Sequence, residues 1–130
     1  MLYRLKNLEE NIATLKSLKQ KSLQEIQNNK LLEWSLRYGI FESIQIVIDI
    51  SCHIANRYNL GVSNTYSECL ENLYKYKYIS KELKESLISA IGLRNILIHK
   101  YVKIDINKLY QFLNLTNDFK KFIDEIKEFI

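Results

Sequence analysis

The segment RNILIHKY, residues 94 to 101, brings an arginine, a histidine and a tyrosine close together in a chain that has only two histidines. A guanidinium is a planar fork of donors that fits a phosphate, and an imidazole exchanges protons near neutral pH. The tyrosine adds a phenol to this set. Arg94, His99 and Tyr101 are therefore candidates for acid–base chemistry at a phosphate ester.

The same residues also have ordinary structural explanations. Arg94 continues the apolar stripe of its expected helix, so it needs either an anionic ligand or a structural salt bridge, for example to Asp49 or Glu42. His99 follows five residues later, about 140° around an ideal helix, so the two side chains converge only if the helix ends or unwinds between them. A single histidine is more often structural than catalytic. From the residues alone, both explanations stay open.

The rest of the chain predicts the helices that must position these residues. The sequence has 130 residues, no proline and three glycines, and 47% of it is hydrophobic, which favours long helices in one domain spanning residues 1–130. Periodic apolar positions and capping residues predict helices from about 3 to 28, from 31 to 58, from Thr65, from Ser80, and from about Asp105 to the end. We therefore predict an all-α, up-and-down bundle of four to five helices.

The second predicted helix is apolar around most of its circumference. Such a helix is either central in its bundle or shared with a partner subunit. One narrow polar line remains on it, formed by Glu42, Gln45, Asp49, His53 and Asn56, whose spacings place them on one face. This line faces either the reaction site or the solvent, and in the first case Asp49 and His53 would support the site.

Charge, the start of the chain and the cysteines limit the class of protein. The formal net charge of +4 is compatible with a polyanionic partner. No run reaches the roughly 18 apolar residues of a membrane span, and the charged start lacks a signal peptide, so we expect a cytoplasmic protein without membrane contact. Reducing conditions would keep Cys52 and Cys69 as packed thiols. The histidines lack neighbouring ligands, so we expect neither a metal nor a cofactor.

The pattern R-N-x-x-x-H-x-Y resembles the signature of the HEPN superfamily, in particular the HepT-type ribonuclease toxins that pair with minimal nucleotidyltransferase antitoxins. The flanking segments IDISCHIANRYNLG (residues 48 to 61) and YSECLENL (residues 66 to 73) also resemble the family in order and spacing. The resemblance covers about residues 30 to 130.

The resemblance implies the toxin of a type VII-like toxin–antitoxin system, a homodimer that cuts RNA without a metal. Arg94 would stabilise the phosphate, His99 would transfer protons and Asn95 would orient the phosphate or ribose, with acid and base supplied by different chains. Tyr101 would accept AMP from the antitoxin, and the added phosphate would occupy the place of the RNA phosphate. The alternatives are a non-catalytic, substrate-binding partner of a nucleotidyltransferase and a dimeric bundle whose polar residues are structural.

Overall fold

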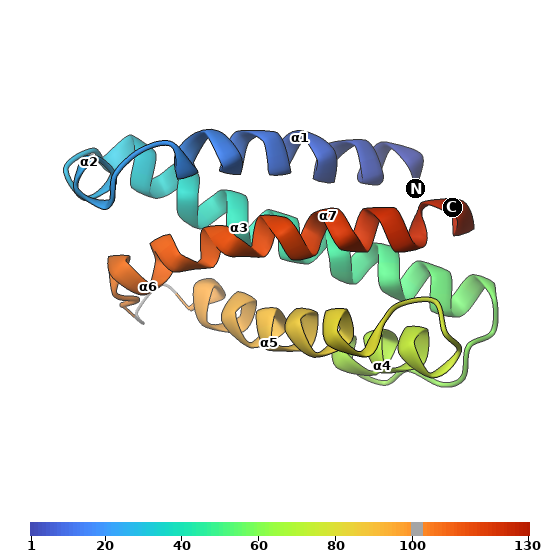
Figure 1. The fold of residues 1–130 in the computed structure, drawn as a ribbon. Helices are drawn as coiled ribbons and strands as arrows, with labels where there is room; N and C mark the ends of the chain where they lie inside the picture. Colours follow the sequence, from blue (N-terminus) through green and yellow to red (C-terminus); the bar gives the residue numbers. More distant parts are fainter. Residues whose placement is uncertain (100–102) are drawn as a thin grey trace.

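The computed structural model describes residues 1–99 and 103–130, and every regular element among them is helical. None of the described helices is both long and apolar enough to cross a bilayer. In chain order the elements are α1 (Leu2–Lys19), α2 (Leu23–Gln27), α3 (Lys30–Arg57), α4 (Tyr66–Lys75), α5 (Lys81–Ile98), α6 (Ile106–Gln111), the 3₁₀ turn η1 (Phe112–Asn114), α7 (Leu115–Ile126) and the 3₁₀ turn η2 (Lys127–Phe129). Figure 1 shows α1, α3, α5 and α7 running in alternating directions along the bundle, which confirms the predicted all-α fold.

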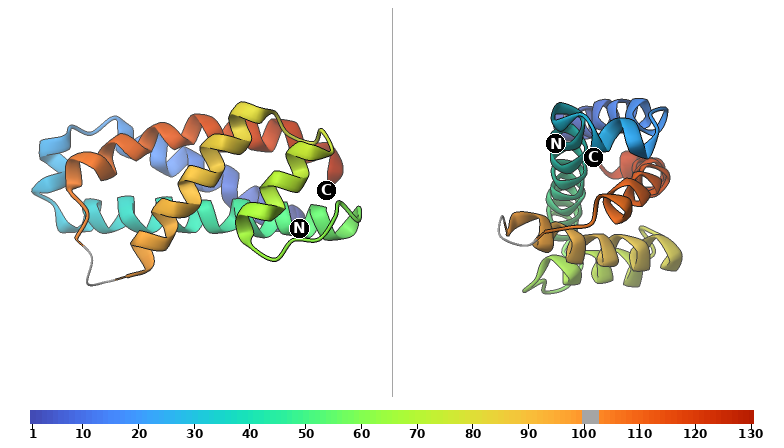
Figure 2. Two further views of the ribbon diagram at one scale, coloured as in Figure 1. Left: turned by 90° about the horizontal axis from the view of Figure 1, so that it is seen from below. Right: turned by 90° about the vertical axis from the view of Figure 1, so that its left-hand side faces the viewer.

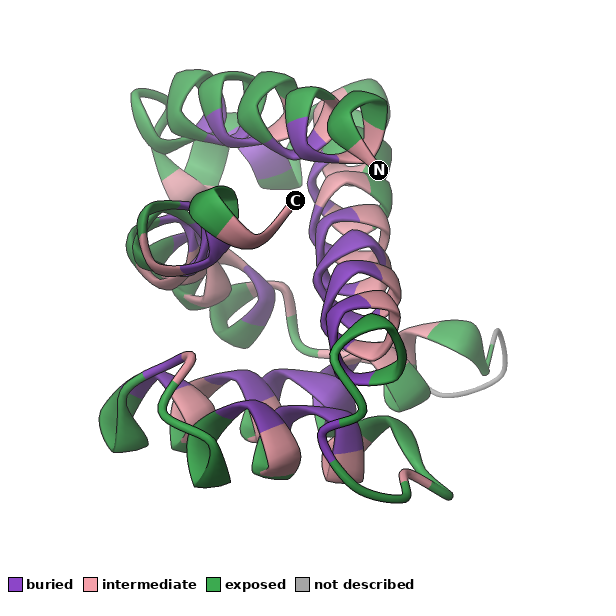
Figure 3. Cartoon of the chain, turned by 90° about the vertical axis from the view of Figure 1, so that its right-hand side faces the viewer, coloured by how far each residue is buried: buried purple, intermediate pink, exposed green. Residues whose placement is uncertain are grey.

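The longest helix, α3, forms the centre of the bundle. It packs against α1, α4 and α5, and more lightly against α2, α6 and α7. Figure 2 shows α5 lying beside α4 and crossing α3 obliquely. Figure 3 shows the buried side of α3 turned toward the other helices. The nearly continuous apolar circumference of α3 is thus explained in the main by its neighbours within the chain, as expected for a central helix.

The first predicted helix, from about 3 to 28, is interrupted after Lys19. Leu18 and Leu23 lie five residues apart, a spacing that takes the apolar pattern off one helical face. Ser22 then starts α2 with a capping box: its hydroxyl accepts from the Glu25 N–H at 3.1 Å, and the Glu25 carboxylate accepts from the Ser22 N–H at 3.4 Å. The prediction of one continuous helix was wrong because it passed over this cap.

The last predicted helix is divided as well, because η1 separates α6 from α7. The 3₁₀ turn covers only Phe112–Asn114, and Leu113 is its buried residue, whereas Thr116, Phe119 and Phe122 are buried on the α-helix that follows. The buried Thr116 hydroxyl donates to the Leu113 carbonyl at 2.9 Å, so its polar group is satisfied. The prediction of one continuous helix followed the apolar spacings of three and four from Phe112 onward, and it therefore missed this 3₁₀ turn.

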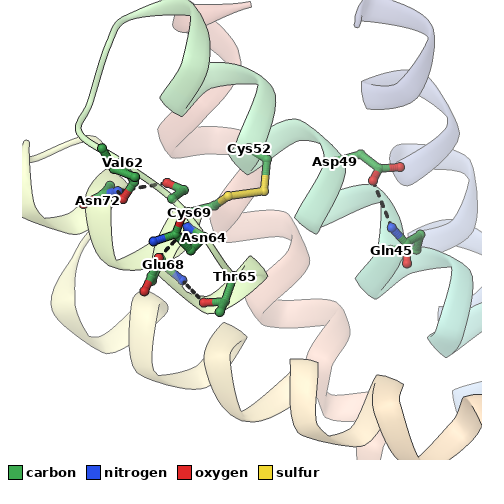
Figure 4. Close-up of a disulfide and its surroundings, with 10 residues drawn as sticks. Gln45, Asp49, Cys52, Val62, Asn64, Thr65, Glu68, Cys69 and Asn72 are labelled. Carbon is green, nitrogen blue, oxygen red and sulfur yellow. Dashed lines mark hydrogen bonds between the residues drawn. A yellow bond between two sulfur atoms is a disulfide. The ribbon is translucent and has the colours of Figure 1, made fainter.

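Cys52 of α3 and Cys69 of α4 are joined by a disulfide, with their Cα atoms 5.0 Å apart (Figure 4). The expectation of two thiols was therefore wrong, although Cys69 is buried as expected. The cysteines lie 17 residues apart in sequence, and only the reversal of the chain between α3 and α4 brings them together. The bond attaches the first turn of α4 to the central helix.

Candidate functional site

The candidate motif begins in the last turn of α5. This helix starts at the predicted Ser80 cap, whose hydroxyl accepts from the Leu83 N–H at 3.3 Å. It ends at Ile98, and His99 takes an extended backbone conformation with φ −82° and ψ 100°. The helix end that a convergence of Arg94 and His99 requires is present, so the direction of the exposed His99 side chain is no longer fixed by the helical repeat.

Arg94 is half-buried at the edge of the apolar stripe, whereas Leu93 is buried in it. The sequence analysis predicted Arg94 on the core-facing side of the helix, whereas the structure buries its neighbour Leu93 there and leaves Arg94 at the edge. The guanidinium carbon lies 5.7 Å from the ring centroid of Phe41 on α3 and 5.4 Å from that of Tyr66 on α4. Both distances allow cation–π attraction, so two aromatic rings from neighbouring helices help to hold the cation.

The hydrogen bonds of Arg94 go to amide oxygens. Its Nε donates to Oε1 of Gln45 at 2.9 Å, and its Nη1 donates to Oδ1 of Asn95 at 3.0 Å. Within residues 1–99 and 103–130, neither Asp49 nor Glu42 forms an ion pair with it, so the structural salt bridge considered from the sequence is wrong for both carboxylates. Arg94 is thus oriented by neutral groups, and its positive charge is not cancelled by either carboxylate.

Asp49 is nevertheless linked to the site through Gln45. Its Oδ1 accepts from Nε2 of Gln45 at 2.9 Å, and its Oδ2 is paired with the Arg4 guanidinium of α1. Figure 4 shows Gln45 and Asp49 one turn apart on α3. The structure therefore connects Asp49, a predicted supporting residue, to Arg94.

The other members of the polar line have different surroundings. Glu42 accepts from Nδ2 of Asn11 on α1 at 2.8 Å. A hydrogen bond from the Tyr38 hydroxyl, and then the bond from Asn11, lower the pKa of Glu42. His53 is half-buried one turn beyond Asp49, and the chain of hydrogen bonds that the described residues form at Arg94 does not include it. Tyr101, the predicted modification site, lies outside the described residues.

Sequence reasoning assigned no role at Arg94 to its neighbours Gln45, Phe41 and Tyr66, or to Arg4, which is linked to Arg94 through Asp49 and Gln45. Gln45 was visible on the polar line, four residues before Asp49, but its role depends on the approach of α5. Arg4, Phe41 and Tyr66 come from α1, α3 and α4, and no local spacing relates them to Arg94. A glutamine on the same helical face as a candidate carboxylate is the one signal that could have been used.

An apolar groove of about 490 Å³ adjoins the motif on the side of α3. Trp34 and Tyr38 on its wall are 58% and 62% exposed, which is high for such large rings. The groove reaches Arg94 through Phe41, which contacts the guanidinium. It is lined by Trp34, Arg37, Tyr38, Phe41, Leu97 and Ile98, the last of which directly precedes His99. An exposed apolar surface of this kind marks a site of binding or association.

In the part of the chain that the structure describes, no three His, Cys, Asp or Glu side chains gather in a way that could hold a metal ion.

Comparison with known proteins places this geometry in context. Residues 8–128 match the profile of the family described as Ribonuclease HepT-like. A tRNA nuclease HepT of Aphanizomenon flos-aquae is 35% identical over 72 residues, which are 55% of this chain and 49% of that protein, so the match spans about half of its length. An mRNA nuclease HepT of Shewanella oneidensis is 28% identical over 97 residues, 74% of this chain and 73% of the relative.

The fold is also that of a solved toxin. The tri-AMPylated Shewanella oneidensis HEPN toxin, solved in complex with an MNT antitoxin, superposes with a TM-score of 0.74 at 25% identity. The similarity covers 93% of this chain and 96% of that one. The HEPN-like resemblance inferred from the motif is confirmed.

Proposed function

This chain belongs to the ribonuclease HepT-like family, and from that premise and the geometry at Arg94 we propose that it is an endoribonuclease and the toxin of a toxin–antitoxin pair. The observation that carries the proposal is the environment of Arg94. Its guanidinium is held by two amide oxygens and two aromatic rings, without an ion pair to Asp49 or Glu42. It therefore keeps a positive charge for a phosphate, five residues before a histidine at the end of the helix.

The chemistry needs only the groups of the motif. The ribose 2′-oxygen attacks the neighbouring phosphorus as its proton passes to a base; the new P–O2′ bond forms while the P–O5′ bond breaks, and the leaving 5′-oxygen receives a proton. His99 serves as the base or as the acid, and Arg94 stabilises the charge on the crowded phosphate. Asn95 uses its oxygen to hold Arg94, so its Nδ2 is the group that orients the phosphate or ribose. No metal takes part.

A second copy of the chain would supply the other half of the acid–base pair. We assign the exposed face around the groove, with Leu31, Trp34 and Tyr38, to this homodimer contact. Large aromatic and aliphatic side chains are typical of the centre of such interfaces. The groove is continuous with Ile98, so an isologous contact on it brings two copies of His99 toward one cleft.

The antitoxin in this proposal is a minimal nucleotidyltransferase. Its reaction would join the phenol oxygen of Tyr101 to the α-phosphorus of ATP and release pyrophosphate. The Shewanella oneidensis toxin with the same fold is tri-AMPylated. A phosphodiester two residues from His99 would compete with RNA for Arg94, because both present the same anionic group.

The test measures cleavage of a single-stranded RNA by Arg94→Ala and His99→Ala, with the exposed Arg57→Ala as the matched control. We expect each motif variant to lose about a hundredfold or more in rate and the control to keep wild-type activity. Cleavage should persist in EDTA, and a 2′-deoxy sugar at the cut position should block it.

Four results would contradict this function. Full activity of Arg94→Ala or His99→Ala would show that the active site lies elsewhere. Cleavage of the 2′-deoxy substrate would exclude the 2′-hydroxyl as nucleophile, and EDTA-sensitive activity restored by magnesium would require a metal. A wild-type chain that binds the nucleotidyltransferase but never cuts RNA would favour the non-catalytic alternative.

A further inference from the structure

Four charged or polar side chains from three helices form a continuous chain beside the motif. It runs from Arg4 on α1 through Asp49 and Gln45 on α3 to Arg94 on α5. Gln45 is the member of this chain that contacts Arg94 directly. We propose that Gln45 is a positioning residue, which fixes the Arg94 guanidinium while leaving its positive charge available to the phosphate. This inference rests on the proposed function, in which Arg94 binds the reacting phosphate.

The two neighbours of Gln45 determine which way its amide points. Arg94 can only donate hydrogen bonds, and an ionised Asp49 can only accept them. The amide must therefore turn its oxygen to Arg94 and its nitrogen to Asp49, as observed with both distances at 2.9 Å. The opposite orientation would place donor against donor and acceptor against acceptor. Gln45 is thus held in one rotamer by its partners, and it holds Arg94 in turn.

The point of attachment on Arg94 favours phosphate binding. Gln45 takes the Nε–H, which lies on the stem side of the guanidinium, and Asn95 takes one bond from Nη1. Among the described residues, no hydrogen-bond acceptor engages Nη2. The outer end of the fork therefore retains donors for an oxyanion, while the rings of Phe41 and Tyr66 lie near the guanidinium.

The charge pattern explains why an amide serves better than a carboxylate here. Arg4 neutralises Asp49, and the neutral Gln45 separates that pair from Arg94. A carboxylate in place of the Gln45 amide would fit the same space but would form an ion pair with Arg94 and repel Asp49. Its negative charge would also face the incoming phosphate, so the site would lose the charge that it needs in the transition state.

The decisive variant is Gln45→Glu, compared with Gln45→Met and with the control Gln20→Glu, which adds the same charge at an exposed position between α1 and α2. At neutral pH we expect Gln45→Glu to lose about a hundredfold in kcat, and Gln45→Met to lose less, because methionine frees Arg94 without neutralising it. The control should match the wild type. Circular dichroism and thermal melting establish that each variant is folded.

A pH series separates positioning from simple structural damage. When the carboxyl that Gln45→Glu introduces is protonated, it again offers a carbonyl to Arg94 and a donor to Asp49, as glutamine does. The kcat of Gln45→Glu relative to the wild type should therefore rise as pH falls below the range in which the carboxyl is ionised. Adding Asp49→Asn removes the repulsion between positions 45 and 49 but leaves the ion pair with Arg94, so it should not restore the rate at neutral pH.

The outcomes distinguish this inference from the proposed function. If Arg94→Ala removes cleavage while Gln45→Glu keeps wild-type kcat, the function stands and the role of Gln45 is overturned. A pH-independent defect, or full restoration by Asp49→Asn, would also overturn it in favour of a structural role. If the wild type cuts no RNA, the proposed function itself fails. Gln45 can then still be tested by nuclear magnetic resonance, in which the Arg94 Nε–H should be protected from solvent exchange in the wild type and not in Gln45→Met.

Discussion

Nδ2 of Asn11 on α1 lies 2.8 Å from Oε1 of Glu42 on α3, and this bond links two helices across the polar line. The Glu42 carboxylate also accepts a hydrogen bond from the Tyr38 hydroxyl, and this bond is the largest cause of its lowered pKa. The same contact raises the pKa of Tyr38. Glu42 therefore belongs to the attachment of α1 and does not act as a counter-ion for Arg94.

The lowered pKa of Glu42 predicts a pH-dependent contribution to stability. Between the folded and unfolded pKa values the unfolded chain binds more protons, so the free energy of unfolding rises with pH in that window. The contribution is present above the ordinary value of 4.5 and is lost as pH falls through the folded value. Urea unfolding should show wild type more stable than Glu42→Gln at about pH 6, with the difference shrinking toward about pH 3.

The control for this prediction is Tyr38→Phe, which removes the hydroxyl but keeps the ring. Carbon-13 titration of the Glu42 carboxyl should give a higher pKa in this variant than in the wild type. A stability difference between wild type and Glu42→Gln that is the same at every pH would contradict the assignment.

Reduction of the Cys52–Cys69 bond should destabilise the protein. Closing a loop of this size restricts the unfolded chain, and for about 15 residues the effect is about 3 kcal/mol. The two cysteines here are 17 residues apart. Urea unfolding with and without dithiothreitol should show a loss of this order, whereas a variant with both cysteines replaced by serine should not respond to the reductant. If a thiol assay shows that both cysteines are reduced and the free energy of unfolding is unchanged, the prediction is contradicted.

The exposed face around Trp34 should control association. Equilibrium sedimentation at micromolar concentration should show a dimer for the wild type and a monomer for Trp34→Glu, because a buried carboxylate opposes the contact. If the acid and base come from different chains, RNA cleavage should decrease in the Trp34→Glu variant, because the dimer is lost. Tyr3→Glu, which replaces a comparably exposed aromatic on α1, is the matched control and should remain dimeric. A fully active monomer would remove the shared cleft.

Tyr101→Phe tests regulation apart from catalysis. The variant loses only the phenol oxygen, so it should keep ribonuclease activity but escape silencing by the nucleotidyltransferase and ATP. Mass spectrometry of the incubated wild type should find AMP on the peptide that contains Tyr101. Modification mapped to another of the nine tyrosines would contradict this, as would a silenced Phe variant. Inhibition by an inactive transferase would indicate direct binding instead.

Local chemistry made much of the fold predictable. Thr65 and Ser80 cap α4 and α5 as expected, since the hydroxyls accept from the N–H groups of Glu68 at 3.2 Å and Leu83 at 3.3 Å. These interactions join residues three positions apart, so sequence spacing is enough to find them.

The site itself was predicted only in part, because its geometry depends on contacts between helices. Arg94 was recognised from its type and position, but Gln45 became significant only when α5 approached α3. The pairing of Cys52 with Cys69 and that of Arg4 with Asp49 likewise require the chain to fold back on itself. The spacing of residues along a helix shows which face of that helix each residue occupies, but it does not show which face of another helix packs against it.

The chain of side chains from Arg4 to Arg94 also has a consequence for the thermodynamics of counterions. Its two arginines and one aspartate leave a single positive charge, because Asp49 is paired with Arg4. Each phosphate neutralised on a single strand contributes about −0.7 to the slope of log K against log salt concentration. The cluster therefore contributes to RNA affinity as one cation, releasing about one condensed ion. Without the Asp49 carboxylate the cluster would act as two cations, so RNA binding would become tighter in dilute buffer but more sensitive to added salt.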